Sequence, residues 1–162
     1  MQNIIKPLLL SSAILCPSVF AGSGVGIIPS YLTDNFSNFR SYIYMSNITQ
    51  APINVTVTLY NQDGNVVKDN DDNPTAGYLR AFDYVYYSEV NTHGTAAYTI
   101  AANSTSLLVL ESTHYGVGYG KIEWEQPGMS LSQAMVAHMR TYRVKSGVES
   151  AYSTHINNGT PF

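Results

Sequence analysis

The stretch INVTVTLYNQDGNVV, residues 53–67, decides the fold class. Over residues 53–60, apolar side chains alternate with polar ones, which is the pattern of a strand with one buried face. Asp63 and Gly64 follow, and Asp-Gly between apolar runs predicts a type I′ hairpin turn, because both central residues of that turn need a positive φ. The stretch therefore predicts a strand that turns back tightly on itself.

The same alternation recurs along the chain, and Gly, Asn or Pro closes most of the runs. At residues 121–125 (KIEWE) it predicts that Trp124 is buried while Glu123 and Glu125 face solvent. In all, about eight strands at short spacing predict an all-β domain, an antiparallel β-sandwich. The other expected strands lie at residues 40–49, 78–90, 98–101, 105–113, 131–144 and 152–156.

Two segments allow more than one interpretation. Residues 129–138 have helical spacing, but β-branched and aromatic residues take over by Tyr142, which favours a strand. Gly116, Gly118 and Gly120 alternate ahead of the KIEWE run. This pattern predicts a flexible turn or a bulged strand edge.

Residues 54–67, followed by residues 98–110 (YTIAANSTSLLVL), resemble a known class of domain. Their strand–DG–strand and strand–polar turn–strand rhythm is similar to that of immunoglobulin-like bacterial export domains. The resemblance implies an immunoglobulin-like β-sandwich, and it implies neither a function nor any site residue.

Residues 1–21 predict a signal peptide. Lys6 gives a positive start, residues 7–15 are mostly apolar, and Val19-Phe20-Ala21 fits a signal-peptidase site that cleaves after Ala21. The apolar run is shorter than the roughly 20 residues that cross a bilayer. We therefore expect a secreted or periplasmic protein with no membrane span after cleavage.

Cleavage leaves a single domain at residues 22–162 without cysteine, because Cys16 lies in the leader. Lipidation of Cys16 is disfavoured, since Leu15 stands where a small residue is expected. Loss of Lys6 changes the formal net charge from −3 to −4, and only 12% of the chain is charged. The absence of a basic cluster argues against nucleic-acid binding.

Tyrosine is the strongest compositional signal, with 13 copies. Tyrosine rings provide large contact areas for sugars or proteins, although they also line ordinary sheet faces. His138, Arg140 and Tyr142 share one strand face, where they can grip a carboxylate or a sugar, or simply form a polar surface. The predicted ligand-binding residues are Tyr42, Tyr44, Tyr84, Tyr86, His138, Arg140 and Tyr142.

A calcium site is predicted at Asp69, Asp71 and Asp72, because calcium prefers several oxygen ligands from a flexible loop. The EF-hand pattern is absent, and a solvated loop is the alternative. The four histidines lack the short spacing of a zinc motif. We find no Gly-x-Ser-x-Gly motif or other catalytic signature, and we expect neither enzymatic activity nor a cofactor.

The sequence thus predicts a non-catalytic protein that acts by contact, as a surface, matrix, adhesion or assembly component. The expected partner is a protein, or a second copy, bound through an edge strand. Residues 22–28 are the expected edge segment, since Pro29 lacks an amide hydrogen. The alternatives are a carbohydrate-binding module that uses tyrosine faces and, third, a small hydrolase.

Overall fold

The computed structural model describes residues 21–34, 38–67, 79–82, 86–90, 95–111 and 116–162, with backbone alone at 79–82, 86–90 and 95. These residues form ten strands and one 3₁₀ helix. The elements are β1 (Gly22–Thr33), β2 (Phe39–Asn47), β3 (Ile53–Asn61), β4 (Leu79–Phe82), β5 (Tyr86–Val90), β6 (Thr95–Ile100), β7 (Thr105–Leu110), β8 (Gly116–Gln126), β9 (Met135–Lys145), β10 (Val148–His155) and η1 (Ile156–Gly159).

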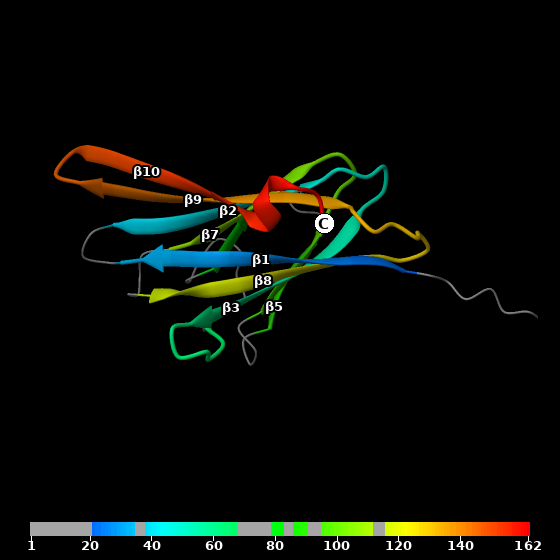
Figure 1. Ribbon diagram of the computed structural model, residues 1–162, viewed down its shortest axis with the longest axis horizontal. Coiled ribbons are helices and arrows are strands. Elements are labelled where there is room, and N and C mark those ends of the chain that lie inside the picture. Colours follow the sequence, from blue (N-terminus) through cyan, green and yellow to red (C-terminus); the bar gives the residue numbers. More distant parts are fainter. Residues whose placement is uncertain (1–20, 35–37, 68–78, 83–85, 91–94, 112–115) are drawn as a thin grey trace, which may run out of the picture.

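The strands form two antiparallel sheets of five strands each. Sheet A has the order β1-β8-β3-β6-β5, and sheet B has the order β10-β9-β2-β7-β4. Figure 1 shows β10, β9 and β2 of sheet B above β1, β8 and β3 of sheet A. The antiparallel β-sandwich that the sequence predicts is therefore the fold.

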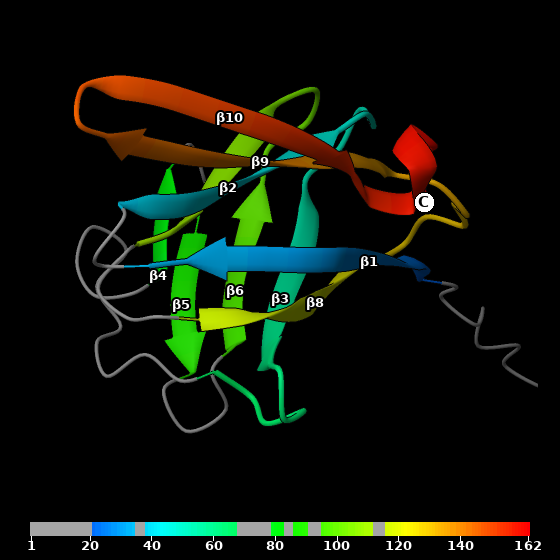
Figure 2. The same ribbon diagram turned by 60° about the vertical axis from the view of Figure 1, so that its left-hand side comes forward.

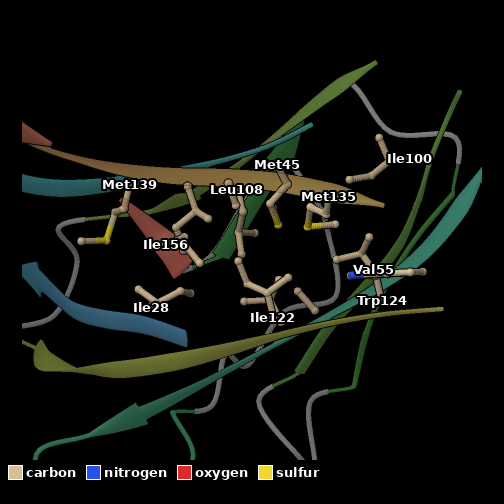
Figure 3. Packing of buried hydrophobic residues seen from close by; sticks show 14 of the residues in the cluster. Ile28, Met45, Val55, Ile100, Leu108, Ile122, Trp124, Met135, Met139 and Ile156 are labelled. Carbon is tan, nitrogen blue, oxygen red and sulfur yellow. The ribbon is translucent and has the colours of Figure 1, made fainter. Parts of the chain in front are cut away.

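The core lies between the sheets and is built from the alternating apolar positions. In β3 these positions are buried, as the 53–60 pattern predicts. Figure 3 shows Ile122 and Trp124 of sheet A facing Met45, Leu108 and Met135 of sheet B. Trp124 is only 2% exposed, which confirms its predicted burial.

The predicted type I′ turn at Asp63 and Gly64 is wrong. That turn needs a positive φ at both residues, but only Gly64 has one, at +79°. The Gly64 amide donates to the Asn61 carbonyl at 3.0 Å. The side-chain oxygen of Asn61 accepts from the amides of Asp63 and Asn65, which fixes a longer turn. The chain then returns through a single bridge, Tyr60 to Val66.

The type I′ geometry instead joins β9 to β10. Ser146 and Gly147 have φ values of 52° and 76°, and the flanking residues Lys145 and Val148 face each other. A two-residue turn of this kind matches the twist of the strands that it connects. It gives the β9–β10 hairpin a register without interruption.

The glycine run at residues 116–120 is not a turn or a bulged edge, because it belongs to β8, which pairs with β1 and β3. A Cβ atom on Gly118 would lie 1.8 Å from the Tyr60 carbonyl oxygen, so this position requires glycine. The bulge lies across the ladder in β1, where the register shifts between Ile28 and Tyr31. Residues 129–134 contain no helix, and the strand begins at Met135.

Candidate functional site

Five of the seven predicted ligand-binding residues lie together on the outer face of sheet B. β2 and β9 pair antiparallel, with Tyr44 opposite His138 and Tyr42 opposite Arg140. Their neighbours in sequence, such as Ile43 and Met139, point into the core. We call this set the tyrosine face, and it consists of Tyr42, Tyr44, His138, Arg140 and Tyr142.

The rings of the tyrosine face are arranged in two contacts. Tyr44 stacks on His138, with 4.7 Å between ring centroids and 8° between planes. Tyr42 and Tyr142 meet edge to face at 6.5 Å and 85°. The Arg140 guanidinium lies 5.9 Å from the centre of the Tyr142 ring, within reach of a cation–π interaction. These contacts set the orientation of the rings relative to one another.

A shallow pocket of about 200 Å³ opens between Tyr42, Tyr44, Arg140 and Tyr142. Tyr142 also lines a neighbouring hollow of about 300 Å³, together with Arg40. Within the part of the chain that the structure describes, Arg140 forms no ion pair, whereas Arg40 bonds Glu111 at 3.1 Å. The pocket thus offers flat rings beside the Arg140 guanidinium.

Protonation of the face follows from its surroundings. Partial burial lowers the pKa of His138, and nearby His155 lowers that pKa further. A hydrogen bond with Glu149 raises the pKa of Tyr142, and desolvation and the charge of Glu149 raise it further. At neutral pH, His138 is therefore neutral and Tyr142 keeps its proton, so that Arg140 carries the positive charge of the pocket.

The remaining predicted residues do not join this face. Tyr86 lies in β5 of sheet A, opposite Thr99 of β6, and therefore in the other layer. Tyr84 lies outside the described residues, as do all three aspartates of the predicted calcium loop, Asp69, Asp71 and Asp72. Among the residues with a described position, no three His, Cys, Asp or Glu side chains converge as a metal site would require.

Sequence reasoning missed a second aromatic pair, on the outer face of sheet A. Tyr60 and Tyr119 stack with 4.9 Å between centroids and 14° between planes. On the same face Lys121 bonds Glu123 at 3.0 Å. Extending the KIEWE alternation backwards by one step places Tyr119 beside Lys121, but the expected turn hid this signal.

Each sheet has two edge strands, β1 and β5 in sheet A and β10 and β4 in sheet B. β1 closes sheet A by pairing with β8 of the same chain, which confirms the edge position predicted for residues 22–28. β10 closes sheet B and pairs with β9. Every residue of β10 is exposed except Thr154, which is half-buried. Val148 and Tyr152 are 68% and 48% exposed. Figure 2 shows β10 along the rim of the molecule.

Across the described residues, no helix has the length and apolar character needed to span a membrane. No protein-family model and no curated protein matches the chain. The chain is similar to the crystal structure of Thermotoga maritima 1070, with a TM-score of 0.49 and 9% sequence identity. This similarity covers 83% of this chain and 93% of that chain.

Proposed function

We propose that this protein is an exported, non-catalytic domain that acts by contact, as a surface, matrix or assembly component. The observation that carries the proposal is β10, an edge strand whose side chains are exposed on both faces. Such a strand offers a row of backbone amides and carbonyls to another strand, and alternate side chains add specificity.

Edge strands are usually protected by lysine, proline, bulges or covering segments. The β10 sequence VESAYSTH contains no lysine or proline, and its pairing with β9 runs without a bulge. β1 contains no charged residue, but it carries Pro29 and a register shift between Ile28 and Tyr31. We therefore place the contact at β10 rather than at residues 22–28.

Export rests on the predicted leader. All ten strands follow residue 21, and β1 begins at Gly22, directly after the expected cleavage site. Removal of residues 1–21 would therefore leave every strand of the sandwich in place.

The test is photo-crosslinking in cells that export the protein. A photoreactive amino acid replaces Ser153 on exposed β10 in one variant, and Gln62 in an exposed turn in the matched control. We expect adducts of higher mass from the Ser153 position and none from the Gln62 position. Adducts at neither position, or equal adducts at both, would overturn the proposed contact.

A second candidate function is carbohydrate binding at the tyrosine face. It is favoured by the pocket that Tyr42, Tyr44 and Tyr142 form beside Arg140. Sugar rings stack on aromatic faces, and a guanidinium binds a carboxylate with two parallel hydrogen bonds.

Isothermal titration with neutral and carboxylate-bearing oligosaccharides tests this candidate. Tyr142→Ala should abolish binding of both kinds of sugar, whereas Arg140→Gln should weaken only the acidic ones. Tyr119→Ala, in the aromatic pair of sheet A, is the matched control and should bind normally. Equal loss in the control, or no binding by the parent protein, would remove this candidate.

A further inference from the structure

We propose that the partner of β10 is a second copy of this chain, joined antiparallel to the first about a two-fold axis at Tyr152. This inference rests on the proposed contact at β10 and names its occupant. It follows from the hydrogen-bonding parity of the hairpin, from the placement of charges along β10, and from the apolar side chains that the strand exposes.

The hairpin turn determines which backbone groups of β10 are free. Because Ser146 and Gly147 form a type I′ turn, Lys145 and Val148 exchange backbone hydrogen bonds. Bonded and non-bonded pairs alternate along an antiparallel ladder. Even-numbered residues of β10 therefore bond to β9. The residues that direct their amides and carbonyls away from the molecule are Glu149, Ala151, Ser153 and His155.

In a second copy of β10, the residues that direct their backbone groups outward must lie opposite these four residues. Two symmetric registers satisfy this condition with nearly full overlap, one with its axis at Tyr152 and one with its axis at Ala151. The first sets Glu149 opposite His155 of the second copy, and it does so twice. The second sets Glu149 opposite Ser153, and His155 opposite Gly147. The first register is favoured because a carboxylate and an imidazole form a hydrogen-bonded or ionic pair.

The side chains also face compatible directions. Glu149 and His155 lie on the outer face, since His155 is opposite His138 of the tyrosine face. A two-fold axis perpendicular to the sheet keeps both outer faces on the same side. Tyr152, which is 48% exposed, would then meet its own copy at a non-bonded pair, where side chains approach most closely.

The dimer would join two five-stranded sheets into one sheet of ten strands, with both tyrosine faces on a single surface. A ligand with repeating units would then meet two pockets together, and binding of the second unit becomes intramolecular. Assembly and ligand binding would thus reinforce each other.

Cysteine crosslinking in the full chain carrying Cys16→Ser tests the register, because each introduced cysteine is then the only thiol. In the proposed dimer, the two Cα atoms at position 152 lie about 4.5 Å apart, within disulfide range. Position 151 is only a diagonal neighbour of its copy, at about 7–8 Å. We expect Tyr152→Cys to form a disulfide dimer under mild oxidation and the matched variant Ala151→Cys to remain monomeric.

A charge test accompanies the crosslink. Glu149→Lys should weaken dimerisation about tenfold in analytical ultracentrifugation, since it disturbs both symmetric pairs. The double variant Glu149→His with His155→Glu restores complementarity and should recover the dimer. Folding of each variant is checked by its thermal melting curve.

The possible failures are distinguishable. Dimers through Ala151→Cys instead of Tyr152→Cys would overturn the Tyr152 register. A chain that sediments as a monomer at high concentration and forms neither disulfide would overturn the second copy as the partner. In that case, adducts with a different protein at Ser153 would still support a contact at β10, whereas their absence would remove the proposed function as well.

Discussion

Strands β1 and β10 are both edge strands, yet their side chains are packed in opposite ways. β1 has glycine at three successive inward positions, Gly22, Gly24 and Gly26, and other parts of the chain pack against them. β10 carries larger side chains on both faces and leaves them exposed. The comparison teaches that β1 has one face covered by its own chain, where the small side chains lie, whereas β10 exposes side chains on both faces.

Phe162 packs against the inward face of β1. A Cβ atom on Gly26 would lie 2.4 Å from the Phe162 ring, and one on Gly24 would lie 2.4 Å from Nε1 of Trp124. That Nε1 donates to the Phe162 carbonyl at 2.7 Å, and the amides of Ala134 and Met135 donate to the same oxygen. The glycines therefore leave room for two large rings, which close the sandwich beneath β1.

We call the region where the Trp124 and Phe162 rings pack beneath the glycines of β1 the seam. The largest effect is expected from Trp124→Ala, which removes one of these two rings. The change removes a side chain that is 2% exposed together with its hydrogen bond to Phe162. Such truncations cost about 3–5 kcal/mol of unfolding free energy. Urea denaturation measures the loss, with Tyr119→Ala on the exposed side of the same strand as the control. Equal midpoints for Trp124→Ala and the parent would contradict the role of the seam.

Gly26→Ala should produce the next largest effect, because it adds a methyl group to the same tightly packed seam. The new methyl group lies within the contact distance of the Phe162 ring, and overpacking costs about 1–3 kcal/mol. Because the clash is with that ring, Phe162→Ala in the same chain should recover part of the loss. A double-mutant cycle by urea denaturation measures this coupling, and strictly additive losses would show that the two positions do not interact.

Those predictions depend on packing that the sequence predicts only in part. The period-two pattern predicted the burial of Trp124 and the shared face of His138, Arg140 and Tyr142, because alternation is a local property of a strand. It did not reveal that β2 lies beside β9, which brings Tyr42 and Tyr44 to that face, since pairing between distant segments leaves no local trace.

The errors have physical causes too. A glycine in a strand can mark close approach of another backbone as well as a turn, and Gly118 is of the first kind because Tyr60 lies against it. The type I′ turn uses Ser146 and Gly147, whereas the side chain of Asn61 redirects the turn at Asp63. The contact between Tyr60 and Gly118 joins distant segments and leaves no local pattern, whereas the turn at Asp63 depends on a side chain only two residues away.

A smaller effect is expected from pH at the tyrosine face. Because its surroundings lower the pKa of His138, the unfolded chain binds a proton more readily than the folded chain does. The contribution of His138 to stability is therefore present above its ordinary pKa of about 6.5 and declines as the pH falls through the lowered value. Thermal melting at pH 7.5 and pH 5 should show a smaller difference in His138→Gln than in the parent. An unchanged difference would contradict this assignment.

The smallest effect on stability, and the sharpest contrast with β1, is expected at β10. Tyr152→Ser removes a ring that is half exposed at a strand edge, so the unfolding free energy of the monomer should change by no more than about 0.5 kcal/mol. The same change removes the side chain that would meet its copy on the proposed axis, and dimer dissociation in analytical ultracentrifugation should increase. Ser150→Ala, two residues along the same face, is the control and should alter neither quantity. A large loss of monomer stability in Tyr152→Ser would mean that β10, like β1, is held by its own chain, and the contrast between the two edges would disappear.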